Sequence, residues 1–98
     1  MGEESISRFV ADNHTQMTNT LSDLVAIPTM NPPGQAYKQC VYYLSGRLNT
    51  WNIEHDVISI SKGKYPRFAI LGEIGKGQES LHLHGHYDVV PSDSPGQF

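Results

Sequence analysis

The sequence predicts a mixed α/β fold in which two helices are followed by a β-sheet. Two stretches, Glu3 to about Ala26 and about Gln35 to Asn49, carry apolar residues at helical spacing. After Ile53 the pattern changes to short apolar runs separated by turns that contain glycine. Helices followed by consecutive strands favour a sheet with helices packed on a face. With 98 residues, the chain is one domain or part of one, residues 1–98.

The first predicted helix begins near Glu3 and continues to about Ala26. Its apolar stripe is interrupted near Asn13 and His14. Ser5 is the candidate N-cap, with Ser7 as its competitor, because a serine side chain can accept a hydrogen bond from the free amides of the first turn. The stripe itself consists of Ile6, Phe9, Val10, Met17, Leu21, Leu24 and Val25.

A proline-rich loop, Pro28 to Gly34, is expected to connect the two helices. Proline disfavours helical geometry in the residue before it, so Ile27 should end the first helix. The loop contains three prolines and one glycine, a composition typical of a rigid connector.

The second predicted helix, from about Gln35 to Asn49, places Cys40 in the middle of its apolar face. A reactive thiol is favoured by a nearby cation or a helix N-terminus, and Cys40 has neither in the sequence pattern. We therefore expect Cys40 to lie in the core. It is the only cysteine, so it cannot form an internal disulfide, which fits a reducing compartment.

Three strands are predicted in the second half of the chain: Ile53 to Ile60, Phe68 to Ile74, and Ser80 to His86. Turns are expected at Lys62 to Lys64 and at Gly75 to Gly77, where glycine separates the apolar runs. The third run alternates polar and apolar residues at period two, which is typical of a strand with two different faces.

The third predicted strand carries histidines at alternate positions, His82, His84 and His86, and Asp88 follows two residues later. Side chains two apart on a strand share a face. One interpretation makes His86 a metal ligand and Asp88 the carboxylate that orients its ring, because a ligating imidazole commonly donates its other N–H to such a group. The alternative is an edge strand whose histidines face solvent, with Asp88 at the start of a turn.

His82 and His84 are expected to contribute much less than His86 to a metal site. A ligand nitrogen lies about 2 Å from its metal, whereas alternate strand residues are roughly 6.6 Å apart. Joining His84 to His86 on one metal would therefore require a sharp bend in the backbone. We expect His82 and His84 to fill space beneath the site or to contact a neighbouring helix.

Charge and composition exclude some classes of partner. The net charge is -3, and the sequence contains no cluster of Lys or Arg that would follow a phosphate backbone, so nucleic acid is not an expected partner. The amino-terminal residues lack an apolar signal core, and no apolar run approaches membrane-spanning length. These features predict a soluble, cytoplasmic protein that does not bind membranes.

Two segments resemble the zinc-dependent aminoacylase family, which includes acetylornithine deacetylase, succinyl-diaminopimelate desuccinylase and carboxypeptidase G. The string LHGHYDVVP, residues 83–91, is similar to the family's first metal-ligand motif. The string LVAIPTMNPPG, residues 24–34, resembles the helix end and proline-rich loop that open the family pattern. The resemblance implies that His86 binds zinc, that Asp88 orients it, and that the loop forms a wall of the active site.

The resemblance also implies the rest of the enzyme. Its members have a three-layer αβα catalytic domain that holds two zinc ions per complete site, and cobalt can replace zinc. Their substrates are N-acyl amino acids or small peptides, whose amide bonds they hydrolyse. The remaining ligands and a glutamate base are absent from residues 1–98, so the chain resembles an amino-terminal piece of that domain. Unpaired sheet edges on such a piece favour self-association into a homo-oligomer.

Two alternative functions remain open from the sequence. A barrel-type amidohydrolase begins its metal site with two histidines separated by one residue, as His82 and His84 or His84 and His86 are. The two helices and the loop that precede the motif are unlike the start of that family. The other alternative is a small non-catalytic α/β module that binds a partner or a structural metal.

Overall fold

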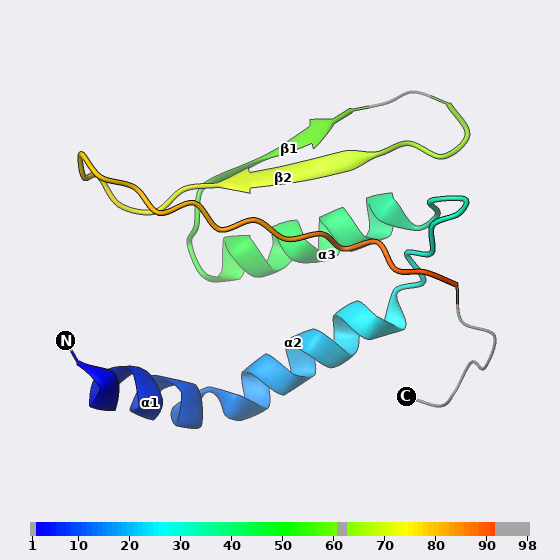
Figure 1. Ribbon diagram of the computed structural model, residues 1–98. Helices are drawn as coiled ribbons and strands as arrows, with labels where there is room; N and C mark the ends of the chain where they lie inside the picture. The colour runs from blue at the N-terminus through cyan, green and yellow to red at the C-terminus, as the bar shows by residue number, and fades with distance from the viewer. Residues whose placement is uncertain (1, 61–62, 92–98) are drawn as a thin grey trace.

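The computed structural model describes residues 2–60 and 63–91 and has a mixed α/β fold, as predicted. Three helices precede a hairpin of two antiparallel strands (Figure 1). In chain order the elements are α1 (Glu3–Asp12), α2 (His14–Ala26), α3 (Tyr37–Thr50), β1 (His55–Ser59) and β2 (Phe68–Gly72). The prediction of two helices was therefore wrong by one, because the first predicted helix is divided.

The division lies at Asn13, between α1 and α2. The backbone N–H of Asn13 and its side-chain amide both donate to the carbonyl of Phe9, at 3.0 Å and 2.9 Å. A side chain that bonds to the local backbone competes with helix continuation, and asparagine is a weak helix former for that reason. The predicted cap, Ser5, was also wrong. It lies inside α1, which begins after Gly2 and has no side-chain cap.

The helix ends around the proline-rich loop follow the local sequence. Ile27 adopts an extended conformation and ends α2 immediately before Pro28, as predicted. The second predicted helix is present as α3 but begins at Tyr37 rather than Gln35, because Ala36 has a left-handed backbone conformation with φ of 61°. A residue in that conformation cannot continue a right-handed helix.

The core lies where the first half of α3 meets the start of the loop. Its buried side chains are Ile27, Thr29, Tyr37, Cys40 and Val41. Cys40 is a core residue, as predicted, and burial raises the pKa of its thiol. A buried thiol with a raised pKa is a packing residue rather than a nucleophile.

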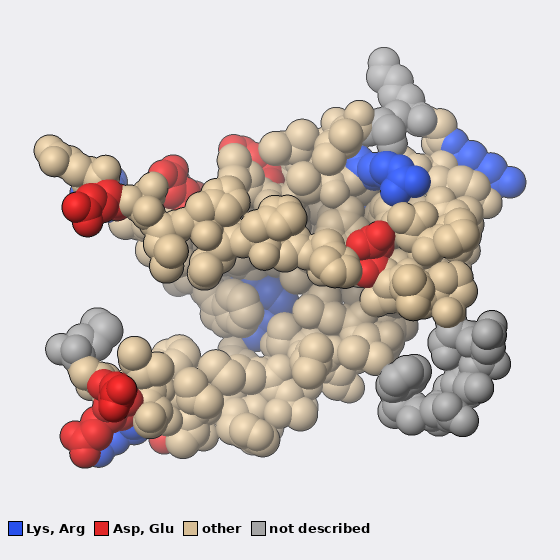
Figure 2. All heavy atoms as spheres, viewed as in Figure 1, with Lys and Arg blue, Asp and Glu red and all other residues tan. Residues whose placement is uncertain are grey.

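Helices α1 and α2 bury no residue against the rest of the described chain. In Figure 1 they run below α3 and apart from the hairpin. Their predicted apolar stripe is consequently exposed at Ile6, Phe9, Val10, Met17, Leu21 and Val25. None of the helices in the described ranges is both long and apolar enough to cross a membrane. Figure 2 shows acidic and basic side chains scattered over one face of the molecule, without a continuous patch of either sign.

The first two predicted strands are present in shortened form as β1 and β2. They pair in antiparallel register, with His55 opposite Gly72 and Ser59 opposite Phe68. The start of β1 is tied to α3 by a contact of 2.6 Å between the Ser45 hydroxyl and Nε2 of His55. Lys62, in the predicted turn between the strands, lies outside the described residues.

The third predicted strand, Ser80 to His86, is absent. Residues 80–88 have no regular secondary structure, and in Figure 1 they cross the molecule as an unpaired ribbon. A strand exists only when a neighbouring strand accepts and donates its backbone hydrogen bonds, and β2 does not pair with this segment. Alternation predicts which side chains share a face, but it does not supply a partner strand.

Candidate metal centre

His86 and Asp88 are in direct contact at the end of the unpaired segment. Nδ1 of His86 lies 2.8 Å from Oδ1 of Asp88 and 3.0 Å from its backbone carbonyl. Both neighbours of Nδ1 are acceptors, so this nitrogen carries the proton and donates it. Nε2 then keeps its lone pair, which is the arrangement that a metal-ligating histidine requires. The imidazole is accessible, since 81% of the His86 side chain is exposed.

The second oxygen of Asp88 is held by the proline-rich loop. The side-chain amide of Asn31 donates to Oδ2 at 3.2 Å. Two hydrogen bonds lower the pKa of Asp88 below its ordinary value. The bond from Asn31 has the larger effect and the bond from His86 the smaller one. Asp88 is therefore ionised at neutral pH. Its Oδ1 accepts a hydrogen bond from His86, and its Oδ2 accepts one from Asn31.

Backbone hydrogen bonds join the same loop to the end of the histidine motif. The amide of Val89 donates to the Thr29 carbonyl at 2.9 Å, and the amide of Asn31 donates to the Val89 carbonyl at 2.8 Å. These bonds form an isolated parallel bridge between Met30 and Val89. We call this contact between residues 29–31 and 87–89 the loop–motif junction. The interpretation of the loop as a connector alone was incomplete, because the loop also positions the motif.

Thr29 strengthens the junction from inside the core. Its hydroxyl donates to the carbonyl of Tyr87 at 2.7 Å, and its side chain is buried. A buried hydroxyl that has its partner holds the backbone beside it, because breaking the bond would leave both groups without one. This bond fixes the carbonyl of Tyr87, which lies between His86 and Asp88 in the chain.

Tyr87 anchors the motif to α3 and β2. Its ring contacts the ring of Tyr37 edge to face, with centroids 5.2 Å apart, and its hydroxyl donates to the Phe68 carbonyl at 2.6 Å. Burial raises the pKa of Tyr87. Tyr87 thus turns inward, whereas His86 and Asp88 on either side of it remain accessible, which is the alternation of an extended chain.

Sequence reasoning assigned no individual role to Thr29, Asn31 or Tyr87. A weak signal was present, because Thr29 and Asn31 are polar residues two apart in a proline-rich stretch and can share one side of an extended backbone. Nothing in the local pattern indicates that the partner of this stretch lies more than fifty residues later.

His82 and His84 contact each other instead of the protein interior. Their rings stack with centroids 6.4 Å apart and an angle of 24° between the planes. Both residues are exposed, so the expectation that they fill space beneath the site or pack on a helix was wrong. The missing sheet partner explains this, since the segment that carries them has no neighbour on which to pack.

His86 fits a metal as a single ligand. Within residues 2–60 and 63–91, no group of three or more His, Cys, Asp or Glu side chains is close enough together to hold a metal ion. A catalytic zinc site commonly uses three protein ligands and an open position. The described residues therefore provide one oriented imidazole of such a site and the groups that hold it.

No protein-family model, no curated protein and no solved structure matches this chain.

Proposed function

We propose that this chain is the amino-terminal part of the catalytic domain of a zinc-dependent amidohydrolase. In this proposal the complete domain has three αβα layers and hydrolyses amide bonds in N-acyl amino acids or small peptides. The observation that carries the proposal is the 2.8 Å contact between His86 and Asp88, which leaves Nε2 of the imidazole free.

The loop–motif junction gives independent support. The two segments that resemble the aminoacylase family, residues 24–34 and 83–91, are far apart in the sequence and have no shared local pattern. In the structure their ends are hydrogen bonded through Thr29, Asn31 and Val89. Two resembling segments that also meet in space, around the candidate ligand, are what a loop forming part of an active site would produce.

Each residue has a defined task in the proposed site. His86 holds the metal through Nε2, Asp88 fixes the tautomer and direction of the ring, and Asn31 fixes Asp88. Bound zinc, or cobalt in its place, would supply an activated water and a polarised substrate carbonyl. The further ligands, the second zinc and a glutamate base would come from segments that residues 1–98 do not include.

A hydrolysis assay on the reading frame extended beyond Phe98 tests the proposal. The wild-type protein should contain zinc and release amine from N-acetyl amino acids. His86→Ala should abolish both, and it should leave the fold intact because the His86 side chain is 81% exposed. His82→Ala is the matched control, an exposed histidine on the same segment, and should keep the hydrolytic activity.

Two results would contradict the assignment. The first is a His86→Ala enzyme with wild-type activity at limiting zinc, which would remove the ligand role. The second is an extended frame that encodes no further His, Asp or Glu ligands and no glutamate base, because the proposed chemistry needs them.

A further inference from the structure

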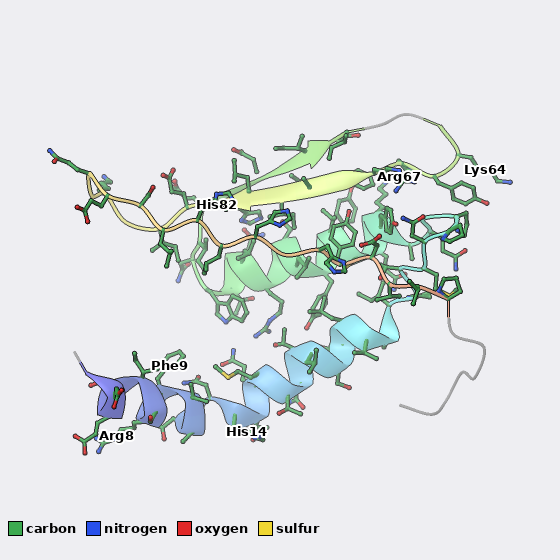
Figure 3. The ribbon with its side chains drawn as sticks, in the orientation of Figure 1. Arg8, Phe9, His14, Lys64, Arg67 and His82 are labelled. Atoms are coloured by element: carbon green, nitrogen blue, oxygen red, sulfur yellow. The ribbon has the colours of Figure 1, made fainter. Side chains whose placement is uncertain are left out.

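His82 and His84 form an imidazole pair that the proposed function does not use. They occupy alternate positions of the unpaired segment, and their rings face each other at a centroid separation of 6.4 Å. Both are exposed to solvent. Figure 3 shows His82 on the segment that leads to the motif, well away from His14 on α2. The pair therefore lies on an accessible surface.

The separation of the two rings is close to that of two imidazoles on one metal ion. With a metal–nitrogen distance of about 2.0–2.1 Å, the ring centroids of two ligands would be about 5 Å apart at a tetrahedral angle and about 4.5 Å apart at the right angle that Cu²⁺ favours. The observed rings are wider than this by roughly one to two ångströms. Alternate backbone positions are roughly 6.6 Å apart, but each ring extends from the backbone and can turn on its side-chain torsions. Rotation about the torsions of these two exposed residues can therefore close such a gap, so the backbone spacing does not by itself prevent a shared metal.

The surroundings favour a site with two protein ligands and bound water. The rest of the described chain contributes no third His, Cys, Asp or Glu to a metal-holding group. Leu81 and Leu83 are 84% and 85% exposed, and strand parity places them on the opposite face of the segment from the histidines. The imidazole face is consequently open to solvent.

We propose that His82 and His84 form a surface chelate for a borderline divalent transition metal. Imidazole nitrogen suits Cu²⁺, Ni²⁺ and Zn²⁺, and the Irving–Williams order makes Cu²⁺ the tightest binder of the three. This site differs from the proposed catalytic position in its ligands, which are His82 and His84 rather than His86 with its partner Asp88. It does not depend on the proposed function and would exist in the isolated chain.

Copper titration of the isotopically labelled 98-residue chain, followed by NMR, tests the proposal. Paramagnetic Cu²⁺ broadens the signals of nuclei close to it. At substoichiometric Cu²⁺ the ring protons of His82 and His84 should disappear first, together. His86, two residues from His84, should broaden after them, whereas His14 on α2 should keep its signals and His14→Ala should change nothing.

A double variant, Leu83→His with His84→Leu, separates pair geometry from histidine content. It keeps five histidines but moves one to the opposite face of the segment, so the preferential broadening should be lost. His82→Ala should likewise abolish the early loss of the His84 signals, whereas His86→Ala should leave the pair unaffected. First broadening at His86, equal broadening at all five histidines, or retained preference in the double variant would overturn the chelate.

Discussion

The side-chain amide of Asn31 donates to Oδ2 of Asp88 at 3.2 Å, although the two residues are 57 positions apart. The other oxygen of Asp88 accepts from His86, so one carboxylate links the proline-rich loop to the candidate ligand. The loop therefore reaches the proposed metal position through an intermediate residue, Asp88. Changes in the loop should be measurable at Asp88 before they are measurable at any metal.

The first prediction concerns the pKa of Asp88. Asn31→Ala removes the largest influence that lowers this pKa, so the value should rise towards 3.8, the ordinary value. Because the folded pKa is the lower one, the interaction stabilises the fold above the unfolded pKa and is lost as the pH falls through the folded pKa. The stability difference between wild type and variant should thus be present at neutral pH and shrink below pH 3.8. A ¹³C NMR titration of the Asp88 carboxyl and unfolding at several pH values measure both effects.

Asn49→Ala is the control for this titration, since Asn49 is an exposed residue in the last turn of α3. It should leave the Asp88 titration unchanged. An Asp88 pKa that does not move in Asn31→Ala would show that the hydrogen bond between them does not persist in solution.

The second prediction concerns the stability of the loop–motif junction. Thr29→Val keeps the buried shape but removes the hydroxyl that donates to the Tyr87 carbonyl at 2.7 Å. Leaving that carbonyl without its partner should lower the free energy of unfolding by about 1–3 kcal/mol. Urea unfolding followed by circular dichroism measures the change.

Thr18→Val is the matched control for Thr29→Val. The Thr18 hydroxyl donates to the His14 carbonyl on an exposed helix face. Its loss should change the unfolding free energy by less than about 0.5 kcal/mol. Equal effects of the two variants would mean that the junction contributes nothing particular to stability.

The third prediction separates the ligand from the group that orients it. In the extended enzyme, Asp88→Asn should lower metal affinity or activity by about 10- to 100-fold, because it removes a charge from the partner of His86 and leaves the ligand itself in place. Zinc titration by calorimetry measures the affinity. Asp56→Asn, an exposed carboxylate on β1, should have no effect. Unchanged zinc affinity in Asp88→Asn would remove the orienting role.

The fourth prediction is that the isolated 98-residue chain releases no amine from N-acetylated amino acids, even with excess zinc. Its described residues place only His86 in a ligand arrangement, and catalytic zinc commonly takes three protein ligands. The assay compares the chain with a metal-only blank. Turnover above the blank that disappears in His86→Ala would mean that copies of the chain associate into a working site.

Local sequence signals were sufficient for the end of α2 and for one residue of the core. Proline after Ile27 ended α2, and the apolar stripe of the second helix placed Cys40 inside. The interruption at Asn13 was visible in the pattern, but whether it bent or divided the helix depended on a second hydrogen bond to one carbonyl. The spacing of apolar residues does not distinguish one bent helix from two separate helices.

Local sequence could not predict whether Ser80 to His86 forms a strand, because strand pairing depends on a second segment as well. Alternation correctly indicates which side chains share a face, and the stacked rings of His82 and His84 agree with it. Likewise, the contact between His86 and Asp88 could be predicted from the sequence, since both lie on one short segment. The contact of Asn31 with Asp88 could not be predicted, because no local pattern connects residues that meet only after the chain has folded.

The loop–motif junction also affects the order of folding. Thr29 and Tyr87 are 58 residues apart, whereas α3 and the β1–β2 hairpin are built from near neighbours. Closing a long loop costs more chain entropy, so local elements should form first and the junction last. Pulse-labelled hydrogen exchange should therefore protect the amide of Ile60, in the hairpin, before the amide of Val89. A newly made chain would pass through a stage that has its helices and hairpin while His86 is still unoriented. Under the proposed function, the metal position would be incomplete until the two distant segments meet.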